Sequence, residues 1–136
     1  HTPDAYENLF STLSQIYSEE TAIYTVFGCG GNRDSCKRSE MAAIAEKYSD
    51  FVIVTTDNPR TESVETINSD IVRGFKGNNY EIILDRKDAI YQMMDQMDGQ
   101  SILLVLGKGG ENYQEIGIEK IPYGDKETIE GYVNAG

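Results

Sequence analysis

The sequence predicts a doubly wound α/β fold, a mostly parallel sheet with helices on both faces. Short apolar runs rich in β-branched and aromatic residues alternate along the chain with stretches whose apolar residues recur at helical spacing. Strands separated by helices of this length pair in parallel, and the helices then cover both faces of the sheet. The 136 residues are enough for one domain with a substantial core, and we expect residues 1–136 to fold as one unit.

The first half of the chain predicts a helix, a strand and a second helix. Thr2 can cap a helix that begins at Pro3. Its apolar face is formed at helical spacing by Leu9, Phe10, Leu13, Ile16 and Tyr17. The run TAIYTVF, residues 21–27, predicts the first strand, and the loop GCGGNRDSCK follows it. The apolar positions of the second helix are Met41, Ile44, Ala45 and Tyr48.

The second half repeats this pattern. Strands are predicted by FVIVTT, YEIIL and SILLVLG, at residues 51–56, 80–84 and 101–107. One helix between them has its apolar positions at Val64, Ile67, Ile71 and Phe75. The next is capped by Asp85, and its apolar face, with methionines that we assign to the core, contains Ala89, Ile90, Met93, Met94 and Met97. A weaker strand over residues 116–121 and a short helix from Asp125 complete the prediction.

Composition argues against several classes of function. The 23 acidic and 12 basic residues give a formal charge of -11, so we expect no nucleic acid partner. No apolar run approaches the roughly 20 residues that cross a bilayer, and the start HTPDAYENLF is no signal peptide, so we expect no membrane association. With one histidine, His1, and two cysteines, Cys29 and Cys36, we expect reduced thiols and no metal site. The chain begins without methionine, and we expect a fragment that is monomeric.

Three polar segments each follow the carboxyl end of a predicted strand: GCGGNRD, TDNPR and GKGGE. In doubly wound sheets ligands bind beyond the carboxyl ends of the strands, so we expect these segments to form a single site at one edge. None of them has the P-loop pattern G-x-x-x-x-G-K-[ST], and the first lacks the glycine spacing of a dinucleotide-binding loop. The sequence therefore predicts a binding site that is neither a P-loop nor a dinucleotide site.

The first and third segments are suited to charged ligands. Glycines in the first let the backbone approach a phosphate or carboxylate, and basic residues surround the start of the following helix: Arg33, Lys37 and Arg38. The alternative is a tight turn with a solvated basic rim. In the third segment Glu111 can accept from an ammonium group and Lys108 can contact an anion, whereas the alternative is an ordinary glycine turn.

The second segment, DNPR, favours a zwitterionic ligand. Pro59 stiffens the loop and lowers the entropy cost of binding. Arg60 can hold a carboxylate through two parallel hydrogen bonds, and Asp57 and the Asn58 carbonyl can accept from an ammonium group. The alternative is that Asp57 and Arg60 only pair with each other across the turn.

The segments HTPDA, VFGCGGNRD, KR, TTDNPRTES, GKGGENYQ and YGDKE, in this order over essentially the whole chain, resemble the C-terminal domain of Mur ligases. The resemblance is to the UDP-N-acetylmuramoyl-tripeptide synthetase branch, and it implies a Rossmann-like domain of an ATP-dependent, amide-forming ligase of cytoplasmic peptidoglycan synthesis. DNPR resembles the signature of members that add meso-diaminopimelate to UDP-N-acetylmuramoyl-L-alanyl-D-glutamate. The alternatives are a lysine-adding ligase of the same family and a stand-alone binding module without activity.

The resemblance also implies roles for individual residues. Arg33 and Arg60 would hold the distal carboxylate of diaminopimelate, and with lysine an unpaired guanidinium there would cost about 1 to 3 kcal/mol. The residues that would orient the distal amino acid head are Asp57, Asn58, Gly107 and Glu111. The residues expected near ATP are Asp4, at the ribose, and Lys37 and Arg38, at the phosphates.

The family's UDP-sugar-binding domain and central ATPase domain have no counterpart in these 136 residues. We therefore expect ATP and Mg²⁺ to bind mainly outside this chain, no catalytic residue within it, and no turnover by it alone. The UDP-N-acetylmuramoyl dipeptide would likewise bind through the other domains. Where family members commonly have aspartate, proline and histidine, this chain has Asn32, Ser39 and Gly110, and Gly110 borders the predicted ammonium acceptor Glu111.

Overall fold

The computed structural model describes residues 3–16, 21–31, 36–97, 101–106, 113–116, 119–122 and 129. Helices and strands alternate through most of this range, as the sequence predicts. The elements, in chain order, are α1 (Pro3–Ile16), β1 (Ala22–Phe27), α2 (Cys36–Tyr48), β2 (Phe51–Val54), α3 (Val64–Val72), β3 (Tyr80–Ile82), α4 (Arg86–Gln96), β4 (Ser101–Leu106), β5 (Tyr113–Ile116) and β6 (Glu119–Pro122).

Four of the strands form a parallel sheet in the order β3-β2-β1-β4. Phe27, the last residue of β1, pairs with the last residues of both neighbours, Val54 of β2 and Leu106 of β4. These three strands therefore end at the same level. The loops that follow them leave from one edge of the sheet, which confirms the parallel arrangement on which the predicted site depends.

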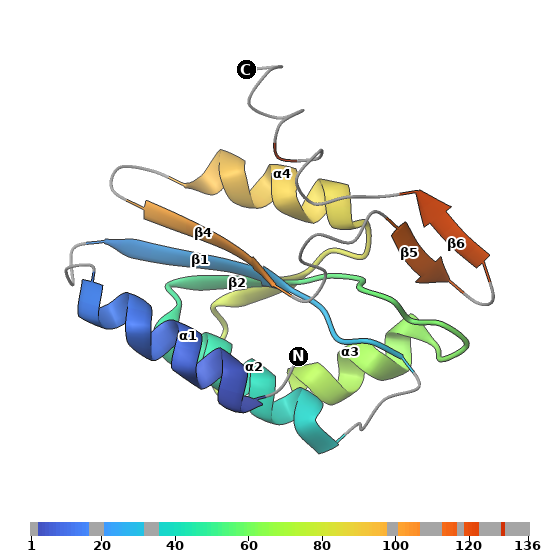
Figure 1. Cartoon of the computed structure of the whole chain (residues 1–136), viewed down its shortest axis with the longest axis horizontal. Helices are drawn as coiled ribbons and strands as arrows, with labels where there is room; N and C mark the ends of the chain where they lie inside the picture. Colours follow the sequence, from blue (N-terminus) through green and yellow to red (C-terminus); the bar gives the residue numbers. More distant parts are fainter. Residues whose placement is uncertain are drawn as a thin grey trace.

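Helices cover both faces of this sheet, with α1, α2 and α3 on one side and α4 on the other (Figure 1). Successive strand residues alternate between the two faces, so that Val52 and Val54 join the larger core whereas Ile53 joins the smaller one. The buried residues of the smaller core are Val26, Ile53, Ala89, Ile90 and Met93. Met94 and Met97 pack against this cluster, in agreement with the prediction that the methionines fill the core.

Local sequence signals begin two of the helices. The Asp85 side chain accepts a hydrogen bond from the Asp88 amide at 3.0 Å, which confirms it as the N-cap of α4. Ser63 caps α3 in the same way and accepts from the Thr66 amide at 3.4 Å. α3 therefore starts immediately after the DNPRTE segment, and the position of its first turn fixes where that loop must end.

The C-terminal part differs from the prediction of one strand over residues 116–121. Two short strands, β5 and β6, pair antiparallel there, with Ile116 opposite Glu119. The glycine at position 117 is the signal for a reversal that the single-strand prediction ignored. Of the predicted helix from Asp125, only Ile129 lies within the described residues; it is helical and packs against the smaller core. Among the residues that the structure describes, no helix is long and apolar enough to span a membrane.

Candidate functional site

The glycine loop after β1 and the DNPR loop after β2 touch each other at the carboxyl edge of the sheet. The Gly31 amide donates to the Asn58 main-chain oxygen at 2.7 Å, and the Thr55 amide donates to the Phe27 oxygen at 2.9 Å. A Cβ atom at position 28 would collide with the Thr55 oxygen, and one at position 31 would collide with the Pro59 oxygen. Glycine is therefore required at both positions for the two backbones to approach this closely.

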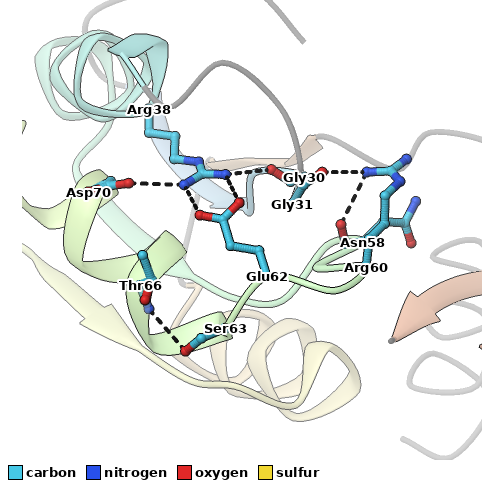
Figure 2. Close-up of polar contacts among 9 residues, drawn as sticks. All are labelled: Gly30, Gly31, Arg38, Asn58, Arg60, Glu62, Ser63, Thr66 and Asp70. Carbon is cyan, nitrogen blue, oxygen red and sulfur yellow. Dashed lines mark hydrogen bonds and ion pairs between the residues drawn. The ribbon is translucent and has the colours of Figure 1, made fainter. Parts of the chain in front are cut away.

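Arg60 is fixed by the loops that it joins. Its Nη1 donates to the main-chain oxygens of Gly31 at 3.1 Å and Asn58 at 3.2 Å (Figure 2). The side chain is half-buried, and the backbone has φ of 54°, which is uncommon for a residue other than glycine. Such a conformation costs about 1 to 3 kcal/mol and persists only where its surroundings hold it. Nη1 of Arg60 is thus anchored to main-chain oxygens of both loops.

Asp57 and Asn58 are almost completely buried in this structure. Each is only 3% exposed. The Asn58 main-chain oxygen serves the Gly31 amide and Arg60, and the charge of Asp57 contributes to raising the pKa of two buried groups, Tyr6 and Cys29, for which burial is the main cause. Both residues therefore belong to the buried part of the DNPR loop.

Arg38 does not lie on the surface, where a phosphate contact would need it. It is 2% exposed, and its guanidinium forms two hydrogen bonds of 2.8 Å with the Glu62 carboxylate. It also donates to Asp70 at 2.9 Å and to the Gly30 main-chain oxygen at 3.0 Å (Figure 2). Hydrogen bonding to Glu62 is the largest cause that raises the pKa of Arg38. Arg38 is thus engaged in a hydrogen-bond network inside the domain, contrary to the expectation that it faces the ATP phosphates.

A second buried arginine, Arg86, was missed by the sequence analysis. It is 2% exposed and donates to the main-chain oxygens of Thr56 and Leu106, both at 3.1 Å. These oxygens lie just beyond β2 and at the end of β4, so Arg86 joins the starts of the second and third loops. Its position in the first turn of α4 was an available signal, because a cation there opposes the helix dipole and needs compensating partners.

The other predicted site residues are placed as follows. Asp4 on α1 and Lys37 on α2 are exposed, and their contact with a nucleotide stays a prediction. Several predicted positions lie outside the described residues: Arg33, Gly107 and Glu111, together with Asn32, Lys108 and Gly110. Within the described ranges, no three His, Cys, Asp or Glu side chains gather as a metal site would need.

A family model, two relatives and a solved structure are similar to this chain. Residues 1–109 match the family model of the Mur ligase, glutamate ligase domain. A UDP-N-acetylmuramoyl-L-alanyl-D-glutamate–2,6-diaminopimelate ligase of Rickettsia conorii is 44% identical over 129 residues, which are 95% of this chain and 27% of the relative. The ligase of the same name from Clostridioides difficile is 46% identical over 130 residues, 94% of this chain and 26% of the relative.

A solved structure of a ligase with this name has the same fold. It matches with a TM-score of 0.90 and 38% sequence identity, over 99% of this chain and 28% of that chain. The chain thus spans about a quarter of the length of the relatives that it matches.

The contact between the two loops can be tested with glycine substitutions. Gly31→Ala should destabilise the domain by about 1 to 3 kcal/mol, because the new methyl group forces the Pro59 backbone away. Gly77→Ala is the matched control, since its Cβ would meet only the Glu46 carboxylate at 3.4 Å. The free energies of unfolding of the two variants are compared by urea denaturation. Equal stabilities would show that the loops are not in contact.

The thiol of Cys29 provides a test of burial beneath the site. Burial raises its pKa from 9.0 to about 12, and Arg38 opposes the rise whereas Asp57 adds to it. Because the folded pKa lies above the unfolded one, this group stabilises the fold fully below about pH 9 and loses that contribution as the pH rises towards 12. At pH 8 we expect iodoacetamide to modify Cys29 more than about a hundredfold more slowly in the folded chain than in urea. Similar rates would contradict this burial.

Proposed function

The chain belongs to the Mur ligase family, and we propose that it serves as the C-terminal domain of a meso-diaminopimelate-adding ligase. In the proposed reaction, ATP phosphorylates the side-chain carboxylate of glutamate in UDP-N-acetylmuramoyl-L-alanyl-D-glutamate and ADP leaves. The amine of diaminopimelate then attacks the acyl phosphate, an amide bond forms, and phosphate and a proton are released. The part of this domain is to bind the incoming amino acid in cytoplasmic peptidoglycan synthesis.

The observation that carries this proposal is the placement of Arg60. Main-chain oxygens of two touching loops hold its Nη1, at the edge of the sheet where ligands of this fold class bind. A guanidinium held in this way is already oriented, so little side-chain entropy is lost when it grips a carboxylate. We propose that Arg60 and Arg33 hold the distal carboxylate of diaminopimelate. The residues proposed to orient the distal amino acid head are Asp57, Asn58, Gly107 and Glu111.

Among the described residues, the candidates for contact with the nucleotide lie on the surface of the domain. Asp4 and Lys37 are exposed and are proposed to meet the nucleotide, whereas Arg38 is engaged inside the domain. The acidic side chains that the structure describes do not form a metal cluster. From the family resemblance, we propose that the nucleotide and the metal bind mainly to another part of the ligase and that this chain contributes no catalytic residue. The UDP-N-acetylmuramoyl dipeptide is proposed to bind to that other part as well.

Selection between diaminopimelate and lysine provides the test. In the complete polypeptide, Arg60→Lys should lower kcat/KM for meso-diaminopimelate about 10- to 100-fold, because lysine cannot reproduce two parallel hydrogen bonds to a carboxylate. Any slow reaction with L-lysine, which lacks the distal carboxylate, should change little. The rate is measured as ADP released in the presence of the UDP-linked dipeptide.

Arg73→Lys is the matched control, since Arg73 has a side chain that is 76% exposed and the substitution is the same. It should leave both rates unchanged. A wild-type enzyme that prefers L-lysine would identify the lysine-adding alternative, and ligand binding with no ADP release would identify the stand-alone module. Either result would contradict the proposed function.

A further inference from the structure

We propose that Arg38 is a positioning residue for the amino acid site. Acting through Glu62, it fixes the loop that carries Arg60 against the glycine loop and so sets the selectivity for a distal carboxylate. This inference rests on the proposed function for its substrate and on the contacts between the loops for its mechanism.

The first link joins Arg38 to the turn that contains Arg60. The Glu62 amide donates to the Pro59 oxygen at 3.0 Å, which closes a turn with Arg60 inside it. The Glu62 carboxylate accepts a hydrogen bond of 2.8 Å from each of the two terminal nitrogens of Arg38. Two parallel hydrogen bonds between a guanidinium and a carboxylate fix orientation as well as distance. The end of the turn is therefore held in one place.

The second link joins the two arginines through consecutive residues of the glycine loop. Arg38 donates to the Gly30 oxygen at 3.0 Å, and Arg60 donates to the Gly31 oxygen at 3.1 Å. The Gly31 amide also donates to the Asn58 main-chain oxygen at 2.7 Å. Figure 2 shows Gly30 and Gly31 between the two guanidinium groups. A shift of Arg38 or Glu62 would therefore move the main-chain oxygens that orient Arg60.

The strained backbone of Arg60 gives a reason for such a clamp. Its φ of 54° lies in the left-handed region, which residues with a Cβ rarely adopt. Residues in this conformation depend on neighbouring contacts to remain there. If the Glu62 end of the turn is released, Arg60 can relax to a negative φ, and its guanidinium then leaves the position that we propose for carboxylate binding.

Asp70 supplies a matched control because it contacts the same guanidinium from a different element. Its carboxylate accepts from Arg38 Nη1 at 2.9 Å, but it lies on α3, outside the turn. The two partners are similarly exposed, with side chains 25% exposed for Glu62 and 18% for Asp70. A purely structural network predicts that neutralising either carboxylate loosens Arg38 and the loops together, more strongly for Glu62, which accepts two of its hydrogen bonds, than for Asp70, which accepts one. The clamp predicts that only Glu62 affects the ligand site.

The experiment compares Glu62→Gln with Asp70→Asn in the complete polypeptide. Glu62→Gln should raise KM for meso-diaminopimelate about tenfold, with kcat and KM for ATP changed less than about twofold. It should also speed amide hydrogen exchange at Gly31 about tenfold without any ligand, because the loops separate more often. Asp70→Asn should leave these quantities near their wild-type values. Glu62→Asp, which keeps the charge but shortens the reach, should behave like Glu62→Gln and guards against a folding defect in one variant.

Two results would overturn the clamp. One is unchanged Gly31 exchange in both Glu62 variants, and the other is an equal effect of Asp70→Asn on exchange and on KM. A wild-type enzyme that does not use diaminopimelate would instead contradict the proposed function. Gly31 exchange, which needs no ligand, would still decide whether Arg38 and Glu62 hold the two loops together.

Discussion

The hydrogen bond from the Gly31 amide to the Asn58 oxygen is the contact on which the candidate site depends. It brings together two loops that are separate in sequence, and it forms only because positions 28 and 31 carry no Cβ atom. Arg60 takes its orientation from the same loops. The parallel sheet places the loops at one edge, but the glycines determine that they touch.

Two buried arginines connect the loops from within the domain. Arg38 links the glycine loop to the end of the DNPRTE turn, and Arg86 links the DNPR loop to the last residue of β4. Burying a cation is costly unless it is paired and hydrogen-bonded, and in both cases the partners are carboxylates or main-chain oxygens at strand and loop ends. In a chain of formal charge -11, these cations lie inside the domain and hold its acidic and carbonyl groups in place.

The sequence was sufficient for the four-stranded sheet and its helices, because their signals are local, but not for the β5-β6 pair. Helical spacing identified the buried side of α4, Asp85 marked its start, and the alternating strands and helices implied a parallel sheet. The contacts of Arg38 could not be predicted in this way, since Glu62 and Asp70 lie 24 and 32 residues away. Basic residues are mostly exposed, so a surface position was the natural expectation for Arg38.

A crystal structure of the complete polypeptide with meso-diaminopimelate would test most directly whether these loops form the amino acid site. We expect the distal carboxylate to lie about 2.8 Å from the Arg60 guanidinium, with the Gly31 amide still bonded to the Asn58 oxygen. A ligand bound away from the edge formed by these two loops, or bound there with its distal carboxylate directed away from Arg60, would contradict this.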